Sequence, residues 1–247
     1  MEENENKDET EVKKENYDIA EEGKEKNKKE KKLSKIIIIS IIITIIVIIN
    51  LLFWVSYYEA APTVTRAKPI IYIYPEQEQE VEVKLLDKDL LTCSYPKYKS
   101  GWNVIANPNG DLVDLDTGNK LYSLYYESNS KEECKVEKEG FCIKKEDIVS
   151  FLEEKLEILG LNYKEKEEFI VYWLPKLEKY NYVYIRFESS EEIENNMGLE
   201  INPKPETLIR IMMTWRGLDE PIKVEEQQLE KVKRTGYTVV EWGGTQI

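Results

Sequence analysis

The chain has 247 residues, of which 41% are hydrophobic, and a formal net charge of −13 from 48 acidic and 35 basic residues. Nucleic acid is therefore not an expected partner, because contacts with phosphates need clustered positive charge. The sequence contains no histidine, which excludes imidazole general bases, Ser-His-Asp and Cys-His catalytic sets, and zinc sites with histidine ligands. We expect neither a metal nor a cofactor.

Residues 1–35 form a charged segment with ten lysines and twelve acidic residues. Such a segment cannot bury enough apolar surface to offset the entropy lost on ordering, so we predict that it is disordered. The chain beyond the next, apolar segment keeps 25 basic and 36 acidic residues, a net charge of −11.

Residues 36–58 contain a run of twenty uncharged residues, 36–55, that is rich in isoleucine. A helix of this length is about 30 Å long and matches the hydrocarbon thickness of a bilayer. A buried core helix would need neighbours that the charged segment cannot supply. A cleaved signal peptide would need a small residue at position −3 of the cut site, where Tyr58 or Glu59 stands. We predict one uncleaved transmembrane helix that contacts membrane lipid.

The charges beside this segment predict its orientation. Seven lysines and two glutamates lie between Lys24 and Lys35, whereas the fifteen residues after 36–55 contain only Arg66 and Lys68 as basic residues. Positive charge is retained on the cytoplasmic side. We therefore expect a cell-membrane protein with a cytoplasmic N-terminus and its C-terminal part outside.

The remainder divides into a short tether, residues 59–66, and a segment of about 180 residues, 67–247, which is long enough for one domain with its own core. Alternation of apolar and polar residues, as in Val81, Val83 and Leu85, indicates strands with one buried face. The Asn109-Gly110 pair favours a two-residue type I′ hairpin turn. We predict strands at 69–74, 81–85, 91–95, 102–106, 121–126, 182–188, 208–216, 222–226 and 236–242.

Two helices interrupt the strands. Apolar residues recur with a 3.6-residue period through 148–159, before Gly160, and again through 169–177 after the capping pair Asn162 and Glu165. We expect Pro175 to kink or restart the second helix. The predicted fold class is α+β: a transmembrane helix, then an antiparallel β-sandwich-like domain with an inserted helical hairpin packed on a sheet.

Four sequence motifs resemble a family of uncharacterised bacterial exported or membrane-anchored proteins. They are KPIIYIYP at 68–75, YPKY at 95–98 followed by Gly101-Trp102, FIVYWLP at 169–175 and VVEWGG at 239–244. The resemblance spans residues 67–247. It implies a surface location and no particular activity or catalytic residue.

Trp102, Glu241 and Trp242 are the candidate binding residues. With Tyr95 and Arg210 they would line a groove that stacks a sugar ring or a peptide, since such pockets combine aromatic rings with a few placed polar groups. That Trp102, Trp173, Trp215 and Trp242 belong to the core, and that the glycines after Trp242 end the strand, is the favoured explanation.

Acidic residues between Asn107 and Asp116 offer oxygen ligands of the kind that calcium prefers, but without the spacing of an EF-hand. Ordinary turns are the favoured explanation. Cys134 and Cys142 are close enough to form a disulfide, and Cys93 is expected to be a buried structural thiol.

We therefore expect the exterior domain to act as a binding or scaffolding module at the cell envelope, with cell-wall glycan or an envelope protein as its partner. The alternative is an envelope hydrolase that cleaves glycan or peptide through carboxylates, with Glu241 as the first residue to test. The sequence favours the binding module over the enzyme.

Overall fold

The computed structural model describes residues 32–54, 65–131 and 135–247. The predicted disorder of 1–31, the tether residues 59–64, residues 55–58 and Cys134 lie outside the described residues. The chain divides into two compact units, Met1–Pro62 and Thr63–Ile247.

The first unit contains a helix at Lys32–Trp54 with a mean hydropathy of 3.3 over its most apolar window and no buried residue in that window. Its 23 residues are long and apolar enough to cross a bilayer. Its polar side chains bond within the helix: Thr44 Oγ1 donates to the Ser40 carbonyl at 2.9 Å and Asn50 Nδ2 to the Ile46 carbonyl at 2.7 Å. Each of these bonds satisfies one side-chain donor within the helix itself, which lowers the cost of placing that group in an apolar solvent.

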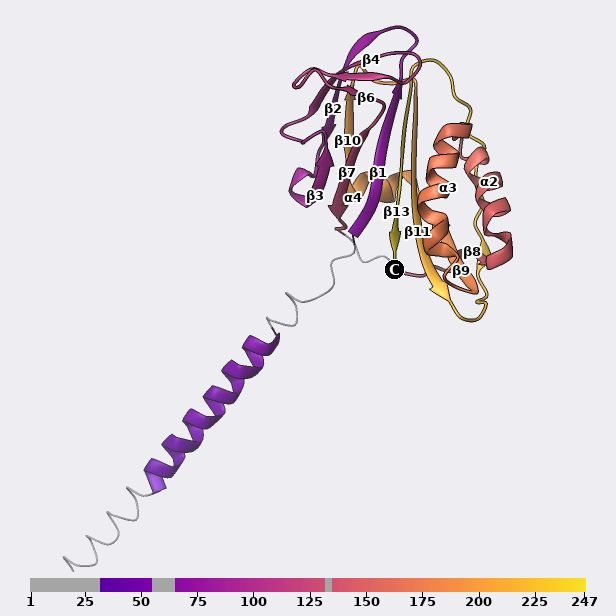
Figure 1. Ribbon diagram of the computed structural model, residues 1–247. Helices are drawn as coiled ribbons and strands as arrows, with labels where there is room; N and C mark the ends of the chain where they lie inside the picture. Colours follow the sequence, from indigo (N-terminus) through magenta and orange to yellow (C-terminus); the bar gives the residue numbers. More distant parts are fainter. Residues whose placement is uncertain (1–31, 55–64, 132–134) are drawn as a thin grey trace, which may run out of the picture. The chain divides into compact units, whose positions relative to one another are not determined.

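The second unit is built in layers, with a larger sheet between a smaller sheet and a pair of helices (Figure 1). Within the described residues, the larger sheet consists of β12 (Glu225–Glu226), β8 (Glu139–Lys144), β9 (Tyr182–Phe187), β11 (Thr207–Leu218), β13 (Thr238–Gln246), β1 (Thr65–Tyr74), β7 (Leu124–Asn129) and β3 (Leu91–Tyr95), in spatial order. The smaller sheet consists of β10 (Leu199–Asn202), β2 (Gln79–Leu85), β4 (Trp102–Ala106), β5 (Leu112–Asp114) and β6 (Lys120–Leu121). The α-helices are α2 (Ile148–Ile158), α3 (Tyr163–Leu177) and α4 (Ser190–Asn196), with 3-10 turns at Lys88–Leu90 and Lys145–Asp147. The α+β class is confirmed.

Strand pairing is mixed, whereas the sequence predicted an antiparallel arrangement. β11 and β13 at the centre of the larger sheet run parallel, as do β12 and β8 at its edge. A parallel neighbour requires a long connection, and residues 219–237 supply it. This segment runs past α2, where the Val232 N–H donates to the Ile158 carbonyl at 2.9 Å.

The helical pair covers one face of the larger sheet, as predicted. Phe151, Leu152 and Leu156 of α2 and the stripe of α3 join the inward side chains of β9, β11 and β13 in one core cluster. A second core fills the space between the two sheets, with Ile71 of β1 and Val83 of β2 among its fully buried residues. The centre of the larger sheet, at β1 and β13, is therefore buried on both faces.

The start of α3 matches the predicted capping pair and its end at Leu177 matches the predicted apolar stripe, while the predicted kink at Pro175 stays a prediction. Asn162 Oδ1 accepts the Glu165 N–H at 3.0 Å, and Glu165 Oε2 accepts the Asn162 N–H at 2.8 Å. Arg234 also pairs with the buried Glu165 carboxylate. The helix continues through Pro175 to Leu177, because a missing N–H so near the end costs only one bond, to the carbonyl of the exposed Val171.

Other differences are local. The predicted strand 121–126 is two strands, since the chain leaves the smaller sheet after β6 and enters the larger one at β7. The predicted two-residue turn is a five-residue loop, 107–111, in which Gly110 has a φ of 91° and Asn109 does not have a positive φ. Helix α4 was not predicted, although its capping box, Ser189 with Glu192, is visible in the sequence.

Candidate functional site: an aromatic cleft with two lysines

Trp102 and Trp242 lie in different cores. Trp102 is 2% exposed between the two sheets, and its Nε1 donates to the Pro96 carbonyl at 2.9 Å. Trp242 is fully buried on the helix side of the larger sheet, with its ring centroid 5.2 Å from that of Phe169.

Glu241 lies next to Trp242 on β13 but belongs to a buried polar network. Its carboxylate accepts hydrogen bonds from the Tyr126 hydroxyl at 2.7 Å and from Arg210 Nε at 2.6 Å, and it has no exposed surface. Arg210 also contacts Glu194 at 2.7 Å and donates to the Met197 carbonyl at 2.8 Å. The network thus connects α4 and the residue after it to the centre of the sheet.

The electrostatics of this network favour the ion pair. Burial raises the pKa of Tyr126 well above its usual value, and the negative charge of Glu241 adds to the effect. Burial is the largest single effect on Arg210 and would lower its pKa, but Glu241, Tyr126 and Glu194 together outweigh burial, so the pKa is raised. Tyr126 therefore remains a neutral donor and Arg210 a cation.

The three predicted binding residues therefore do not line a common open groove in this structure. The physical reason is that β13 is covered on both faces, so neighbouring side chains such as Glu241 and Trp242 enter separate buried regions. The arrangement favours the alternative that both tryptophans are core residues. That any of the three contacts a ligand stays a prediction.

An open cleft of about 690 Å³ lies elsewhere, between α3, β1 and the connection from β6 to β7. Two of the sequence motifs meet there, since Lys68 comes from the motif at 68–75 and Tyr172 and Pro175 from the motif at 169–175. The residues that line the cleft are Lys68, Tyr122, Lys164, Glu167, Glu168, Val171, Tyr172, Pro175 and Lys176.

Lys68 has a strained backbone. Its φ is 62°, in the left-handed region that side chains other than glycine rarely adopt, and it precedes Pro69, which disfavours this region further. It lies where the register of β1 shifts against both neighbouring strands. Its Nζ is 5.4 Å from the ring centroid of Tyr172 and 5.8 Å from that of Tyr125. Strain of this kind costs about 1–3 kcal/mol and is typical of functional positions.

The glycines of the motif at 239–244 make room for this irregular stretch of β1. A Cβ on Gly243 would lie 3.0 Å from the Pro69 backbone nitrogen. One on Gly244 would lie 2.6 Å from the Met213 carbonyl oxygen and 2.8 Å from the Trp173 ring. The motif at 239–244 therefore supports the site without lining it.

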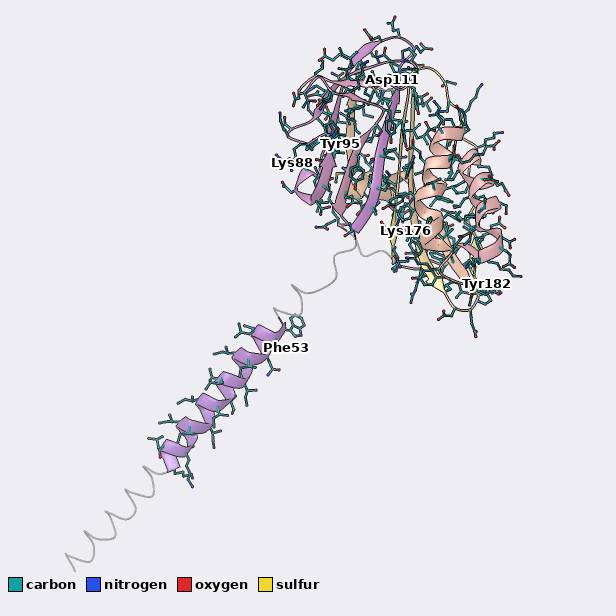
Figure 2. The ribbon with its side chains drawn as sticks, viewed as in Figure 1. Phe53, Lys88, Tyr95, Asp111, Lys176 and Tyr182 are labelled. Carbon is teal, nitrogen blue, oxygen red and sulfur yellow. The ribbon has the colours of Figure 1, made fainter. Side chains whose placement is uncertain are left out.

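Lys176 faces the same cleft from the last turn of α3, beside the strands of the larger sheet (Figure 2). Its Nζ is 3.4 Å from the Tyr172 ring centroid and donates to the Tyr172 carbonyl at 2.9 Å. Burial lowers its pKa, and the positive charges of Lys179 and Lys68 lower it further. Among the residues that the structure describes, no carboxylate lies within 4.0 Å of either the Lys68 or the Lys176 ammonium.

Aromatic rings connect the cleft to the core. The Tyr72 ring centroid lies 6.5 Å from those of Trp242 and Tyr122 and 6.4 Å from that of Tyr74. The Tyr72 hydroxyl donates to Glu168 Oε2 at 2.6 Å, and burial together with this carboxylate raises the pKa of Tyr72. Tyr122, at the outer end of the series, is 56% exposed. A ligand in the cleft would therefore meet a ring that is anchored in the core.

The acidic turns are held by their own hydrogen bonds. Asn109 Nδ2 donates to Asp111 at 2.8 Å, Asp116 pairs with Lys99 at 2.9 Å, and Asp114 accepts from the Thr117 hydroxyl. No group of three or more carboxylate or thiol side chains within 32–54, 65–131 and 135–247 is placed to hold a metal ion. Asp111 and Lys176 lie well apart (Figure 2).

The cysteines differ from expectation. Cys93 is exposed, because β3 is an edge strand of the larger sheet, so the prediction of a buried thiol is wrong. Cys142 has a free thiol, whose sulfur accepts the Ile222 N–H at 3.4 Å. It borders a second open cavity, of about 720 Å³, between β8 and α2. The Lys155 ammonium there is paired with Glu154 at 2.9 Å, and the Lys144 ammonium lies 3.9 Å from Glu146.

No protein-family model matches this sequence, and comparisons with curated proteins and with solved structures find no match. The resemblance of the four motifs to a bacterial envelope family therefore stays a prediction.

The two carboxylates that contact Arg210 should differ sharply in their effect on stability. Glu241→Gln should lower the free energy of unfolding by about 3 kcal/mol or more, because it leaves the buried Arg210 guanidinium without its fully buried counter-ion. Glu194→Gln removes a carboxylate whose side chain is 53% exposed and should cost less than about 1 kcal/mol. Urea unfolding of the full chain in detergent measures both values, and equal losses would contradict the assigned network.

The strain at Lys68 can be tested with a pair of variants. Lys68→Gly and Lys68→Ala both remove the ammonium, but only glycine adopts a φ of 62° without a Cβ penalty. Lys68→Gly should therefore be more stable than Lys68→Ala by about 1 kcal/mol. Urea unfolding under the same conditions gives the difference, and a more stable alanine variant would show that the left-handed backbone is absent.

Proposed function

We propose that this chain is a single-pass membrane protein and that residues 65–247 form an extracytoplasmic binding module. The ligand enters the cleft formed by Lys68, Tyr122, Tyr172 and Lys176. Its source is the cell envelope, as cell-wall glycan or an envelope protein.

The helix Lys32–Trp54 supports the anchor by its length and composition. The lysines that precede it in the sequence support a cytoplasmic N-terminus, because basic residues flanking a span stay on that side. An uncleaved anchor places the second unit outside the cell, in contact with the envelope.

One observation carries the proposal for the cleft: two ammonium groups lie 3.4 and 5.4 Å from the centroid of the same tyrosine ring, and neither has a carboxylate within 4.0 Å among the described residues. Two positive charges beside the same ring repel each other, and this repulsion lowers the stability of the folded domain unless a bound group of opposite charge offsets it. The strained backbone at Lys68 points the same way, since glycine would fit that conformation at lower cost. Open aromatic surface beside placed charges is typical of a binding site.

The alternative, a hydrolase that works through Glu241, draws no support from the position of that residue. A general acid or a nucleophile must reach its substrate, whereas the Glu241 carboxylate is fully buried and bonded to Tyr126 and Arg210. Binding without catalysis is therefore the function that the geometry favours.

Orientation is tested by labelling in intact cells with a membrane-impermeant maleimide. A chain with Cys134→Ser and Cys142→Ser keeps only the exposed Cys93 and should be labelled without lysis. A matched chain with Cys93→Ser added and Glu3→Cys in the N-terminal segment should be labelled only after lysis. The reverse pattern would overturn the proposed orientation.

Ligand binding is tested by retention of the detergent-solubilised full chain on cell-wall material. Binding to an envelope protein is tested by crosslinking the chain to envelope membranes and measuring how much of it is retained. Tyr122→Ser should reduce retention about ten-fold, because one well-placed aromatic contact contributes about 1.4 kcal/mol. Tyr163→Ser is the matched control, since Tyr163 is 72% exposed and lies outside the cleft. The proposal fails if the unaltered chain is not retained, or if both variants lose retention equally.

A further inference from the structure

The distribution of charge along the cleft narrows the class of ligand. We propose that the cleft binds a saccharide with a single anionic group, with the anion at the Lys68–Lys176 end and the sugar hydroxyls toward Glu168. This inference rests on the proposed function, and it chooses a glycan over an envelope protein as the partner.

The cationic end is unusual within this acidic domain. Arginines of the second unit that are buried or partly buried have a carboxylate close by: Arg66 with Glu188 at 2.7 Å, Arg186 with Glu192 at 2.8 Å, Arg210 with Glu241 at 2.6 Å and Arg234 with Glu165 at 2.9 Å. Lys68 and Lys176 have aromatic rings in place of such a partner. An ammonium has three N–H donors, and the Tyr172 carbonyl takes only one from Lys176. An anionic group supplies both the charge and the acceptors that are missing.

The repulsion between Lys68 and Lys176 also supports an anionic ligand. The positive charge of Lys68 is among the causes that lower the pKa of Lys176, after burial and Lys179. The two ammonium groups therefore repel each other across the cleft. A bound anion reverses the sign of that interaction, and the relief of repulsion adds to the affinity.

The opposite end of the cleft carries two carboxylates, Glu167 and Glu168, and one exposed ammonium, Lys164, so acidic groups are in excess there. Glu168 lies eight residues before Lys176 on α3, about 12 Å along the helix axis at 1.5 Å per residue. A carboxylate accepts hydrogen bonds from hydroxyl groups, as Glu168 already does from Tyr72 at 2.6 Å, and it repels a second anion. The separation fits a ligand with one charged end and one end rich in hydroxyls.

The surface between these ends is aromatic and apolar. Tyr122 and Val171 are 56% and 67% exposed, and Tyr172 lies below the two lysines. Flat rings of this kind accept the apolar face of a sugar, while the polar groups at each end fix its direction. A free inorganic anion would use only one end of this site.

The test compares simple probes on the full chain in detergent at low ionic strength, by saturation-transfer NMR titration. Glucose 6-phosphate and glucuronate represent the two anionic groups, phosphate and carboxylate. Glucose, inorganic phosphate and N-acetylglutamate each lack one half of the proposed ligand. One of the anionic sugars should bind at least ten-fold more tightly than glucose, than inorganic phosphate and than N-acetylglutamate.

Variants connect the affinity to the cleft. Lys176→Gln should weaken binding of the anionic sugar about ten-fold, whereas Lys204→Gln, at an exposed lysine outside the cleft, should leave it unchanged. Thermal unfolding is measured for each variant. If Lys176→Gln does not fold, Lys68→Gly replaces it, since that change removes the other ammonium and relieves backbone strain.

Three outcomes overturn the inference. The first is that glucose binds as tightly as the anionic sugars do, and the second is that inorganic phosphate or N-acetylglutamate binds as tightly as those sugars. The third outcome is that Lys176→Gln leaves the affinity for the anionic sugar unchanged. The retention assay separates this failure from a failure of the proposed function. If envelope material still retains the chain and Tyr122→Ser still releases it, the cleft binds a ligand of another class. If retention is also absent, the proposed function fails too.

Discussion

Strand β13 is covered on both faces, and the arrangement of the second unit depends on this constraint. It lies between β11 and β1 in the larger sheet, with the α2–α3 pair on one side and the smaller sheet on the other. An ionised side chain in such a strand requires a counter-ion, which explains why Glu241 is bonded to Arg210. Tight packing also explains the adjacent glycines, because a Cβ on Gly244 would overlap its neighbours.

Burial on one face or on both faces explains where prediction from the sequence succeeded and where it failed. Strands with one wet face, such as β2, alternate clearly and were predicted within two residues of their bounds. The helical pair and its capping residues were equally visible. β13 lacks alternation because both of its faces are buried, so its Glu and Trp resembled exposed functional residues when only the sequence was considered. Alternation also cannot assign a strand to a sheet, and for this reason the passage from β6 to β7 was read as one strand.

The cleft cannot be predicted from the sequence, although two of the segments that line it are distinctive sequence motifs. The motifs at 68–75 and 169–175 were recognised as distinctive, yet they are about a hundred residues apart in the chain, and only the packing of α3 beside β1 brings them together. The left-handed backbone of Lys68 leaves no mark on the sequence, because a lysine before a proline predicts an extended conformation. The sequence also cannot show that Lys68 and Lys176 lack counter-ions among the residues that the structure describes. The domain has many carboxylates, and only the three-dimensional structure shows which lysines they pair with.

The way in which the chain enters the second unit has a mechanical consequence. The first described residue after the helix Lys32–Trp54 is Thr65, which begins β1, an inner strand that pairs with β7 on one side and with β13 on the other. Tension transmitted from the N-terminal side therefore acts along β1 and loads both ladders in shear, so that their hydrogen bonds resist together. An edge strand such as β3 would instead peel away bond by bond. The point of attachment thus makes the second unit resistant to tension along the chain.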